Sequence, residues 1–594
     1  MRISTHHLVP LWAAALLGLN LSTAPSSADA TPAEWVALYE SPPTRAQTPF
    51  DYVAALTTDG EGNVYSAITG EDDEGDDHIV VVKYEPAGVV QWTNSFKGGN
   101  RTTAHEITLD HAGNVYVAGV DRNTIATPGN PATGADIVTL KFDPEGALLW
   151  TAHYAQPSSD APEAIAVNAA GQVYVTGYSY NETNTLDYVT IKYDLDGTEL
   201  WVRRFDGAAG NDDRPSDLAL DRRGNVLVTG ATTDRCYLGN DGDEECYTDI
   251  TTLKYSPEGD LIWERTFDGP TGGSDRGNAL AIDRFGNIHV AGISVDTSYD
   301  SRWVTIKYSP RGRKLWTRFT NDNEDFESPS AVAVNRRGQV YVAGGAEFSV
   351  VKYNRRGRRE WNRNPLSGRI SGIAFDQQGN LCVGGRTFDE VGNGIGFGAV
   401  KLDSAGNLLW CGEWIRNTGG RQISLSAAFT AQGDIYVGGY SFGTPHGDPA
   451  AATVKFSPPL TAPLPTVTIY ALDPIAHEGS GKRSAGAFLL RRRGSTENEL
   501  TVPYQVGGNA ENGVDYEALS GEVTIPAGSS RAIIMVNPID DPEIESTERV
   551  ELQLQAGDEA PYRLGRRDRA TVYILDDDRH RMPWHWWWHG KGTR

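Results

Sequence analysis

A single phrase recurs eight times between Gly62 and Gly433, and this repetition limits what the chain can fold into. Each copy contains a short apolar strand, a tight turn and a second apolar strand, as in AIAVNAAGQVYVTG ending at Gly177. The seven intervals between the first and last turn glycines average 53 residues. That period is too long for a helical repeat and fits a four-stranded propeller blade with loop insertions. The turn glycines are Gly62, Gly113, Gly171, Gly224, Gly286, Gly338, Gly379 and Gly433.

The second half of each copy completes a four-stranded sheet. A β-branched strand ends in a lysine and an aromatic residue, as at Lys83-Tyr84, and a turn then leads to a strand that holds a tryptophan, as at Trp92. This order of strands, turns and loop is the one expected of a blade. The sequence therefore predicts an all-β chain in which residues 31–459 form an eight-bladed β-propeller. We expect the repeated lysines to pack their stems along the blade and to keep their ammonium groups in solvent.

The eighth copy is incomplete, because it ends at Ser457-Pro458-Pro459 without a tryptophan strand. The segment Trp35-Val36-Ala37-Leu38-Tyr39, which precedes the first copy, has the pattern of that missing strand. We expect it to pair beside Lys455-Phe456 and to close the ring, which hides the sheet edges that an open array would expose.

The start of the chain and its charge indicate where the protein works. Residues 1–30 have the layout of a secretory signal peptide, with an apolar run from Leu8 to Leu21 and small residues at Ala28-Asp29-Ala30. No other segment is apolar for long enough to span a bilayer. The formal net charge of −25 argues against nucleic acid and anionic membranes as partners. We therefore expect a secreted or extracellular protein, associated with a cell surface or free of it.

Cysteines and acidic loops leave some alternatives open. Cys236 and Cys246 bracket one loop and are expected to form a local disulfide. Cys382 and Cys411 fit either a cross-strand disulfide or two buried thiols. The acidic runs at 71–77 and 240–245 fit either a solvated rim or a cation site.

The repeats between Trp35 and Pro459 resemble the secreted bacterial β-propeller repeat family, the SBBP type. That family's units follow a pattern similar to D-x-A-x-A-I-A-V-D-x-x-G-N-V-Y-V-T-G, followed by V-x-K-Y and G-x-x-x-W strands. The resemblance implies a propeller fold and says little about activity, because propellers support many chemistries.

A second domain follows a proline-rich linker at 460–465. Residues 466–578 contain seven short alternating strands, such as LTVPYQV and ATVYIL, and they predict an immunoglobulin-like β-sandwich. Acidic residues gather where these strands end.

This second domain resembles the Calx-β family, a calcium-sensing module. The matching motifs are A-x-E-G at 476–479, G-x-D-Y at 513–516, I-P-A-G at 525–528, the acidic run at 539–548 and ILDDD at 574–578. The resemblance implies a Ca²⁺ site, and clustered carboxylates that repel one another suit a hard divalent ion. Glu543 stands where the family tends to use a backbone carbonyl. The implied ligands are Glu478, Asp515, Asp540, Asp541, Glu545, Glu548, Asp576, Asp577 and Asp578.

The tail at 579–594, RHRMPWHWWWHGKGTR, combines four tryptophans with histidines and basic residues. It fits either an interfacial or glycan-contacting segment, or an end that is disordered or folded back onto the sandwich.

Taken together, these patterns favour a binding or adhesion module whose partner is a protein or glycan at the cell surface. The alternative is an extracellular enzyme that acts on polysaccharide, with Asp160, Asp213 and Asp275 as acid/base candidates at equivalent blade positions. Evenly repeated acids favour a structural role, because a catalytic site usually breaks the symmetry of its repeats.

Overall fold

The computed structural model describes residues 32–576 except 42–49, 73, 123–133, 157–158, 239–243, 271, 297–299, 321–327, 346, 389–393, 416–421, 443–448, 459–464, 480–484, 494–495, 497–498, 543, 557–559, 561 and 566. Every named element in this part of the chain is a β-strand. Among these residues there is no helix long and apolar enough to cross a membrane. The signal peptide, the tail and all of the linker except Pro465 lie outside the described residues. The chain divides into two compact units, Met1–Pro459 and Leu460–Arg594.

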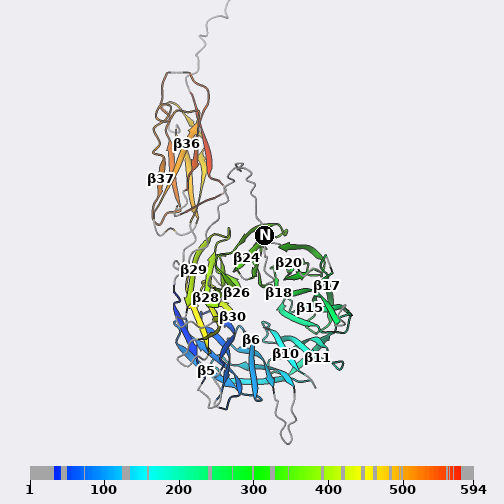
Figure 1. The fold of residues 1–594 in the computed structure, drawn as a ribbon. Helices are drawn as coiled ribbons and strands as arrows, with labels where there is room; N and C mark the ends of the chain where they lie inside the picture. The colour runs from blue at the N-terminus through cyan, green and yellow to red at the C-terminus, as the bar shows by residue number, and fades with distance from the viewer. Residues whose placement is uncertain are drawn as a thin grey trace, which may run out of the picture. The chain divides into compact units, whose positions relative to one another are not determined.

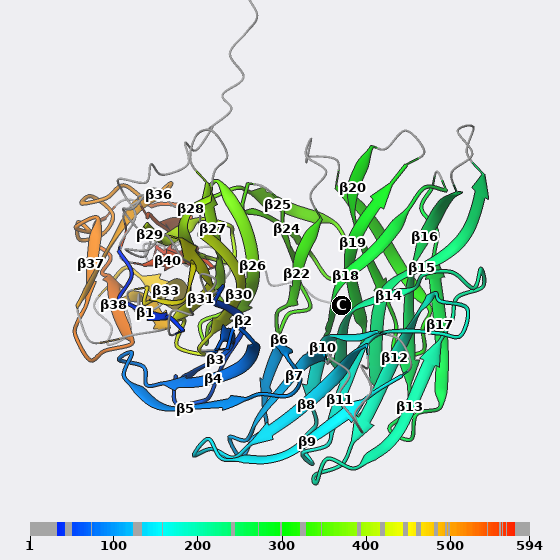
Figure 2. The ribbon, with the colours of Figure 1, turned by 60° about the horizontal axis from the view of Figure 1, so that its bottom comes forward.

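The first unit is a β-propeller, in which four-stranded antiparallel sheets follow one another around a ring (Figure 1). The first strands of successive blades contact each other, and β30 contacts β2, so the ring is closed. Figure 2 shows the strands of each blade running side by side. A single bridge between Asp77 and Arg101 links the sheets of blades one and two.

The first four blades have the following strands. Blade one contains β2 (Tyr52–Thr58), β3 (Val64–Glu71), β4 (Asp77–Tyr84) and β5 (Val90–Phe96); blade two contains β6 (Arg101–Leu109), β7 (Val115–Arg122), β8 (Ala135–Phe142) and β9 (Leu148–Tyr154). Blade three contains β10 (Asp160–Val167), β11 (Val173–Tyr180), β12 (Leu186–Tyr193) and β13 (Glu199–Phe205); blade four contains β14 (Arg214–Leu220), β15 (Val226–Leu238), β16 (Glu244–Tyr255) and β17 (Leu261–Phe267).

The remaining blades complete the ring. Blade five contains β18 (Asp275–Ile282), β19 (Ile288–Val295), β20 (Ser301–Tyr308) and β21 (Lys314–Thr320); blade six contains β22 (Pro329–Val334), β23 (Val340–Gly344), β24 (Ser349–Tyr353) and β25 (Arg359–Arg363). Blade seven contains β26 (Gly368–Phe375), β27 (Leu381–Phe388), β28 (Gly394–Leu402) and β29 (Leu408–Ile415); blade eight contains β30 (Gln422–Phe429), β31 (Ile435–Phe442), β32 (Pro449–Phe456) and β1 (Trp35–Tyr39).

The middle strands of each blade form the core. β3 and β12 are buried along their whole length, as strands covered on both faces should be, whereas the outer strand β5 is exposed at alternate positions. The first strand of every blade carries a register shift near its middle, such as that between Pro162 and Ala164. The apolar runs of the repeat therefore become buried middle strands, and the tryptophan strand becomes the blade's outer edge.

A recurring joint holds each blade to the next and corrects the expectation that the lysines face solvent. Lys192 is only 6 % exposed. Its Nζ donates a hydrogen bond of 2.9 Å to the backbone carbonyl of Pro257, in a turn of the next blade, and Trp201 Nε1 donates to the same oxygen over 3.1 Å. The ammonium also lies 5.2 Å from the centroid of the Tyr174 ring. The lysine can be buried because a carbonyl and an aromatic face replace its water.

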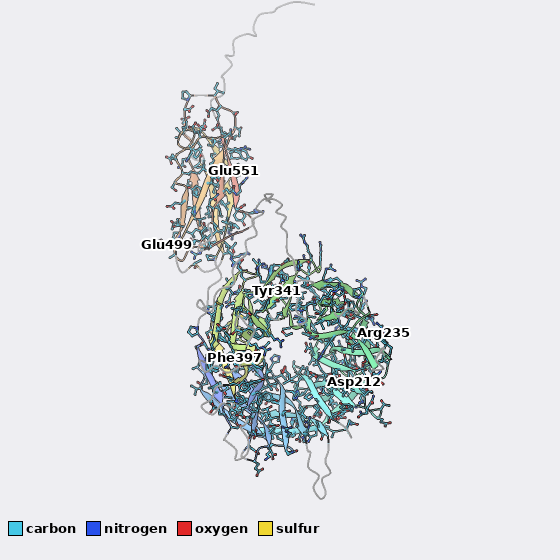
Figure 3. The ribbon with its side chains drawn as sticks, in the orientation of Figure 1. Asp212, Arg235, Tyr341, Phe397, Glu499 and Glu551 are labelled. Carbon is cyan, nitrogen blue, oxygen red and sulfur yellow. A yellow bond between two sulfur atoms is a disulfide. The ribbon has the colours of Figure 1, made fainter. Side chains whose placement is uncertain are left out.

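Other blades repeat this joint. Lys352 Nζ lies 5.3 Å from the centroid of the Tyr341 ring, and Tyr341 is labelled in Figure 3. Lys401, in blade seven, is buried against a carboxylate instead, with Nζ 2.8 Å from Asp376 Oδ2. The sequence pattern correctly marked the lysine as part of the repeat, but the position is a contact between blades.

The two ends of the propeller chain meet in blade eight. β1 pairs antiparallel with β32, and Trp35 lies opposite Lys455, at the position that the repeat pattern assigned to it. Lys455 Nζ and Trp35 Nε1 then donate to the carbonyl of Pro86 in blade one, over 2.8 and 2.9 Å. The joint between blades seven and eight is different, because β32 is not followed by a turn and a fourth strand. There, Trp410 Nε1 is buried without a hydrogen-bond partner among the described residues.

The second unit is a β-sandwich with its own hydrophobic core, which contains Phe488, Tyr516 and Val550. One sheet has the strand order β38-β35-β33-β40 and the other β34-β41-β39-β36-β37. β36 alternates buried and exposed residues, as expected of a strand with one face on the core. The strands are β33 (Thr466–Asp473), β34 (Ile475–His477), β35 (Gly486–Arg493), β36 (Leu500–Gly508), β37 (Glu522–Ile525), β38 (Arg531–Val536), β39 (Glu548–Leu554), β40 (Arg563–Leu564) and β41 (Arg569–Leu575).

The cysteines resolve one of the open alternatives. Cys236 and Cys246 form a disulfide between β15 and β16. Cys382 and Cys411 are both buried and do not form a disulfide, so the two-thiol interpretation holds.

Candidate metal centre

The strand register of the sandwich brings acidic residues to one end of the five-stranded sheet. β34 runs parallel to β41, so the residues that follow these strands, Glu478 and Asp576, leave the sheet at the same end. β39 runs antiparallel to β41 and begins with Glu548 at that end. The connections that precede β37 and β39 supply Asp515 and Glu545. Acidic residues at strand ends in the sequence thus become neighbours in space.

Asp515, Glu545 and Glu548 form the centre of this cluster. One carboxylate oxygen from each residue lies within 4.8 Å of the other two. Two ligand oxygens on opposite sides of a calcium ion lie at most about 5 Å apart, because each bond is roughly 2.3–2.6 Å long. The three carboxylates therefore have a spacing that one calcium ion can bridge.

Backbone hydrogen bonds hold the cluster in place. Asp515 Oδ2 accepts a hydrogen bond of 2.6 Å from the amide of Glu511, and Asp576 Oδ2 accepts one of 2.8 Å from the amide of Glu545. Glu548 Oε2 is different, because it is buried and has no hydrogen-bond partner among the described residues. A buried carboxylate oxygen without a donor is costly, and a bound cation removes that cost.

The raised pKa values of Glu478 and Glu548 show that the carboxylates of the cluster repel one another. Burial, followed by the nearby carboxylates of Asp576, Glu545, Asp541 and Asp515, raises the pKa of Glu478 to about 7. Burial and the neighbouring Asp515 also raise the pKa of Glu548 well above its usual range. Without a cation, protons compensate for the crowding of negative charge, so metal binding should release protons.

The remaining predicted ligands are only partly accounted for. Asp541 lies close enough to Glu478 to raise its pKa, whereas Asp540 is exposed. Asp577, Asp578 and Glu543 lie outside the described residues.

An acidic cluster in the propeller has a different arrangement. Asp72, Glu74 and Asp76, from the acidic run at 71–77, also bring one oxygen each within 4.8 Å of one another. Lys97 Nζ contacts all three, at 3.0 Å from Glu74 and 3.1 Å from Asp76. Burial acts to raise the pKa of Asp72, but the Lys97 ammonium and the backbone amides of Asp76 and Glu74 lower it to about 2. This cluster has its own counter-cation.

The three aspartates proposed as acid/base candidates are not brought together. Asp160 accepts a hydrogen bond of 3.0 Å from the amide of Gln156, and Asp213 accepts one of 2.8 Å from the amide of Thr233. Asp275 likewise accepts from the amide of Gly269. Burial raises the pKa of each aspartate to about 6. Each one accepts a hydrogen bond from a backbone amide in its own blade or in the connection that leads into it, which is a repeated structural role.

Asp275 has a further feature that the sequence did not indicate. It lies with Asp249 and Asp268, one oxygen of each being within 4.8 Å of the others. Burial, and then repulsion from Asp268, Asp234 and Asp275, raises the pKa of Asp249 to about 7. Asp249 of blade four thus has a raised pKa beside Asp275 of blade five.

Sequence patterns also missed a cavity of about 400 Å³ at the end of blades one to three that carries the long loops. Its lining includes Arg101, Arg122, His105 and Tyr178. Arg101 and Arg122 lie directly opposite each other on β6 and β7, and Arg101 Nε is 3.3 Å from Asp77 Oδ2. Like charges at opposed strand positions repel, and the carboxylates of Asp77 and Asp160 in the same lining partly offset the two arginines. An opposed pair of arginines is not unique to this blade, because Arg369 lies opposite Arg386 in blade seven.

Comparisons with known proteins agree with this architecture. Residues 476–578 match the Calx-beta domain family, so the chain carries a Calx-beta domain near its C-terminus. An uncharacterized WD repeat-containing protein of Acanthamoeba polyphaga mimivirus is 22 % identical, across 44 % of this chain and 24 % of the viral protein. The matched region thus spans about a quarter of that relative's length.

Two solved structures show the likeness of each unit. The C-terminal WD40 domain of Sif2 is 11 % identical with a TM-score of 0.43, covering 68 % of this chain and 97 % of that one. The apo form of the Calx CBD1 domain is 25 % identical with a TM-score of 0.17, covering 19 % of this chain and 99 % of that one. The strand topology and the family match at 476–578 show that the chain combines a β-propeller with a Calx-beta sandwich.

Proposed function

We propose that this protein is a secreted or cell-surface binding protein whose sandwich binds calcium and whose propeller recognises a protein or glycan. The observation that carries the proposal is the cluster of Asp515, Glu545 and Glu548, with Glu478 and Asp576 beside it. Asp515 and Glu548 form no ion pair with a lysine or arginine among the described residues.

The donor set favours calcium over other common metals. All the described side chains of the cluster are carboxylates, and hard oxygen ligands suit calcium and magnesium. Zinc prefers sulfur and nitrogen ligands, which the cluster does not offer among its described members. Magnesium demands a compact octahedral set, whereas calcium accepts carboxylates that come from separate loops.

Calcium bound here would join parts of the sandwich that are distant in sequence. Asp515 belongs to the connection after β36, Glu545 to the connection before β39, and Asp576 follows β41. An ion that links these segments stabilises the folded state, because the unfolded chain does not hold the ligands together.

The propeller supplies the recognition surface of this proposal. The cavity lined by Arg101, Arg122, His105 and Tyr178 lies at the end of the blades where the long loops 123–134 and 236–246 emerge. Binding residues tend to lie on loops that a rigid scaffold positions. A carboxylate of a glycan or an acidic peptide fits the paired arginines of this cavity.

The calcium part is tested by scanning calorimetry of the full chain in EDTA and in calcium. We expect the transition of the sandwich to gain about 2.7 kcal/mol at a hundredfold excess of calcium over Kd, while the propeller transition stays unchanged. Glu548→Gln together with Asp515→Asn should abolish the gain. Glu522→Gln, which changes an exposed carboxylate on β37, is the matched control and should keep it. A sandwich transition that does not move in millimolar calcium would refute the proposal.

A second candidate function is hydrolysis of an extracellular polysaccharide, and the group of Asp249, Asp268 and Asp275 is the observation that favours it. General acid and base catalysis needs two carboxyl groups whose pKa values are set apart by their surroundings. A screen for turnover of polysaccharides tests this candidate. Activity that is lost in Asp275→Asn would support an enzyme, and no turnover of any substrate would leave the binding function alone.

A further inference from the structure

The turns at one end of blades four to six depart from the rest of the repeat. In each blade, the turn between the first and second strands and the turn between the third and fourth lie at the same end, because all the strands are antiparallel. In blades four to six, five of these turns read DRRG at 221–224, DRFG at 283–286, SPRG at 309–312, NRRG at 335–338 and NRRG at 354–357. The equivalent turns of blades one, two, three, seven and eight contain no lysine or arginine.

The arginines of these turns are exposed and lack ionic partners. Arg222, Arg223, Arg284 and Arg311 are all exposed. The acidic residues next to them in sequence are already paired with the buried lysines of the joint, since Asp221 Oδ2 lies 2.7 Å from Lys254 Nζ and Asp283 Oδ2 lies 3.3 Å from Lys307 Nζ. No acidic side chain of the described residues forms an ion pair with these four arginines.

A groove of about 660 Å³ runs between blades four and five at this end. β15 and β18, which Figure 1 labels, contact each other across the boundary between these two blades. Arg222 and Arg223 from blade four and Arg284 and Arg311 from blade five line the groove. Ile262 and Phe285 line it as well, although they are 50 % and 61 % exposed. The Arg284 guanidinium lies 4.6 Å from the centroid of the Phe285 ring.

The fold does not require this composition. The same turns close with DHAG at 110–113 or NAAG at 168–171, so the turn positions accept small neutral residues. Gathering like charges without partners costs free energy, and the protein as a whole carries a net charge of −25. A place where a chain departs from its own repeat at a cost, without a structural gain, marks a functional surface.

We propose that this groove is a second binding site, which takes an acidic polysaccharide through its carboxylate or sulfate groups. Guanidinium groups bind such anions in a bidentate manner, and arginine rather than lysine supplies the charge in all five turns. The exposed Ile262 and Phe285 offer apolar surface to the face of a sugar ring. The arginine turns continue into blade six, which provides a track for a chain longer than the groove.

Charge density favours a polysaccharide over nucleic acid. Duplex DNA carries one charge for about every 1.7 Å of its axis, so the net charge of −25 of the whole protein repels it strongly. A polysaccharide with acidic groups spaced along the chain is repelled less by the rest of the surface and can still pair with the local arginines. The site lies at the opposite end of the blades from the loop cavity and does not depend on calcium.

The test measures binding of the full-length protein to fluorescent polygalacturonate and dextran sulfate, with neutral dextran as a control, at low salt in EDTA. We expect both anionic polymers to bind, dextran not to bind, and the affinity to fall steeply as salt is added. Replacing Arg222, Arg223, Arg284 and Arg311 together with alanine should raise Kd at least tenfold. Because EDTA removes calcium, failure of this binding and failure of calcium binding by the sandwich are separate results.

The matched control removes four exposed arginines from the sandwich instead, by Arg491→Ala, Arg493→Ala, Arg531→Ala and Arg549→Ala. It should bind like the parent, and both variants should keep the parent's melting temperature because the changed side chains are exposed. Equal loss of affinity in the two variants would reduce the effect to overall charge and overturn the proposal. It is likewise overturned if neither polymer binds, or if single-stranded oligo-dT binds more tightly than polygalacturonate.

Discussion

Two of the three-carboxylate clusters, one from each unit, have similar spacing but different surroundings. Asp72, Glu74 and Asp76 in the propeller enclose the ammonium group of Lys97. Asp515, Glu545 and Glu548 in the sandwich are surrounded by further acids, and burial and those acids raise the pKa of Glu478 beside them to about 7. An acidic cluster is thus informative about metal binding only when its counter-charge is known.

The difference extends to buried acids elsewhere in the propeller. Asp376, Asp221 and Asp283 each lie within ion-pair distance of the lysine of their blade joint. The propeller satisfies these carboxylates from within, whereas Asp515 and Glu548 of the sandwich have no lysine or arginine partner among the described residues. Calcium should therefore change the stability of the sandwich more than that of the propeller, where Asp249, Asp268 and Asp275 also lie together without an ion-pair partner among the described residues.

The largest expected effect is the loss of stability when a carboxylate that forms an ion pair inside the propeller is removed. Asp376→Ala leaves the Lys401 ammonium buried without its partner, which lies at 2.8 Å in the parent protein. Removing one member of a buried ion pair costs about 3–5 kcal/mol, so the propeller transition should move to a much lower temperature in calorimetry. Calcium should not restore it.

A pair of variants separates the lost charge from the lost turn contacts. Asp376 also accepts a hydrogen bond of 2.8 Å from the amide of Asn380, which Asp376→Asn can keep through its amide oxygen. Asp376→Asn with Lys401→Met should recover much of the stability, because no buried charge is left. If Asp376→Ala melted at the parent's temperature, the claim that internally paired carboxylates stabilise the propeller would be wrong.

The next largest expected effect is a dependence of the sandwich's stability on pH, which tests whether its carboxylates lack a counter-charge. The pKa of Glu478 is about 7 in the folded sandwich against 4.5 as its ordinary value, so the folded state binds more protons between these pH values. This contribution to stability is fully present below about pH 4.5 and is lost as pH rises through about 7. In EDTA the sandwich should therefore melt at a lower temperature at pH 8 than at pH 5.5.

Calcium should reverse this trend, because it replaces the protons and binds more tightly to ionised carboxylates. The melting temperature gained from calcium should be larger at pH 8 than at pH 5.5. Glu478→Gln serves as the control and should reduce the pH dependence in EDTA, while the raised pKa of Glu548 leaves part of it in place. The propeller also contains aspartates whose burial raises their pKa to about 6, and its transition can move with pH, but calcium should not alter that movement. A calcium gain that is independent of pH would contradict the assignment of Glu478 to the site.

The sequence predicts the architecture well because repeats and alternation report directly on strands. The turn glycines, the lysine-aromatic pairs and the tryptophans mark the strands of the blades, and the incomplete eighth copy indicates the strand at Trp35. The acids of the sandwich are found in the same way, since strand ends are visible in the sequence and parallel pairing of β34 with β41 brings two of those ends together.

Other features depend on contacts between repeats, which a pattern within one repeat does not contain. The burial of Lys192 requires the carbonyl of Pro257 in the next blade. Lys97, which neutralises the acidic run at 71–77, lies outside that run in sequence. The pairing of Arg101 with Arg122 depends on strand register. Each feature depends on which residue, distant in sequence, lies close in space, and hydrophobic periodicity does not give that information.

The smallest expected effect comes from a substitution that makes the acidic cluster of the propeller resemble that of the sandwich. Lys97→Ala removes the cation from Asp72, Glu74 and Asp76, and their mutual repulsion should then resemble that of the sandwich cluster. The loss of an exposed ion pair costs at most about 1 kcal/mol, so the propeller should melt only slightly lower in EDTA. Calcium should now stabilise the propeller, and a titration should show a weak additional class of bound calcium. Lys97→Arg keeps a cation in the cluster and should bind no additional calcium. If Lys97→Ala gained no calcium either, then three carboxylates at this spacing would be insufficient, and the buried, unpartnered oxygen of Glu548 would be the feature that makes the sandwich cluster a metal site.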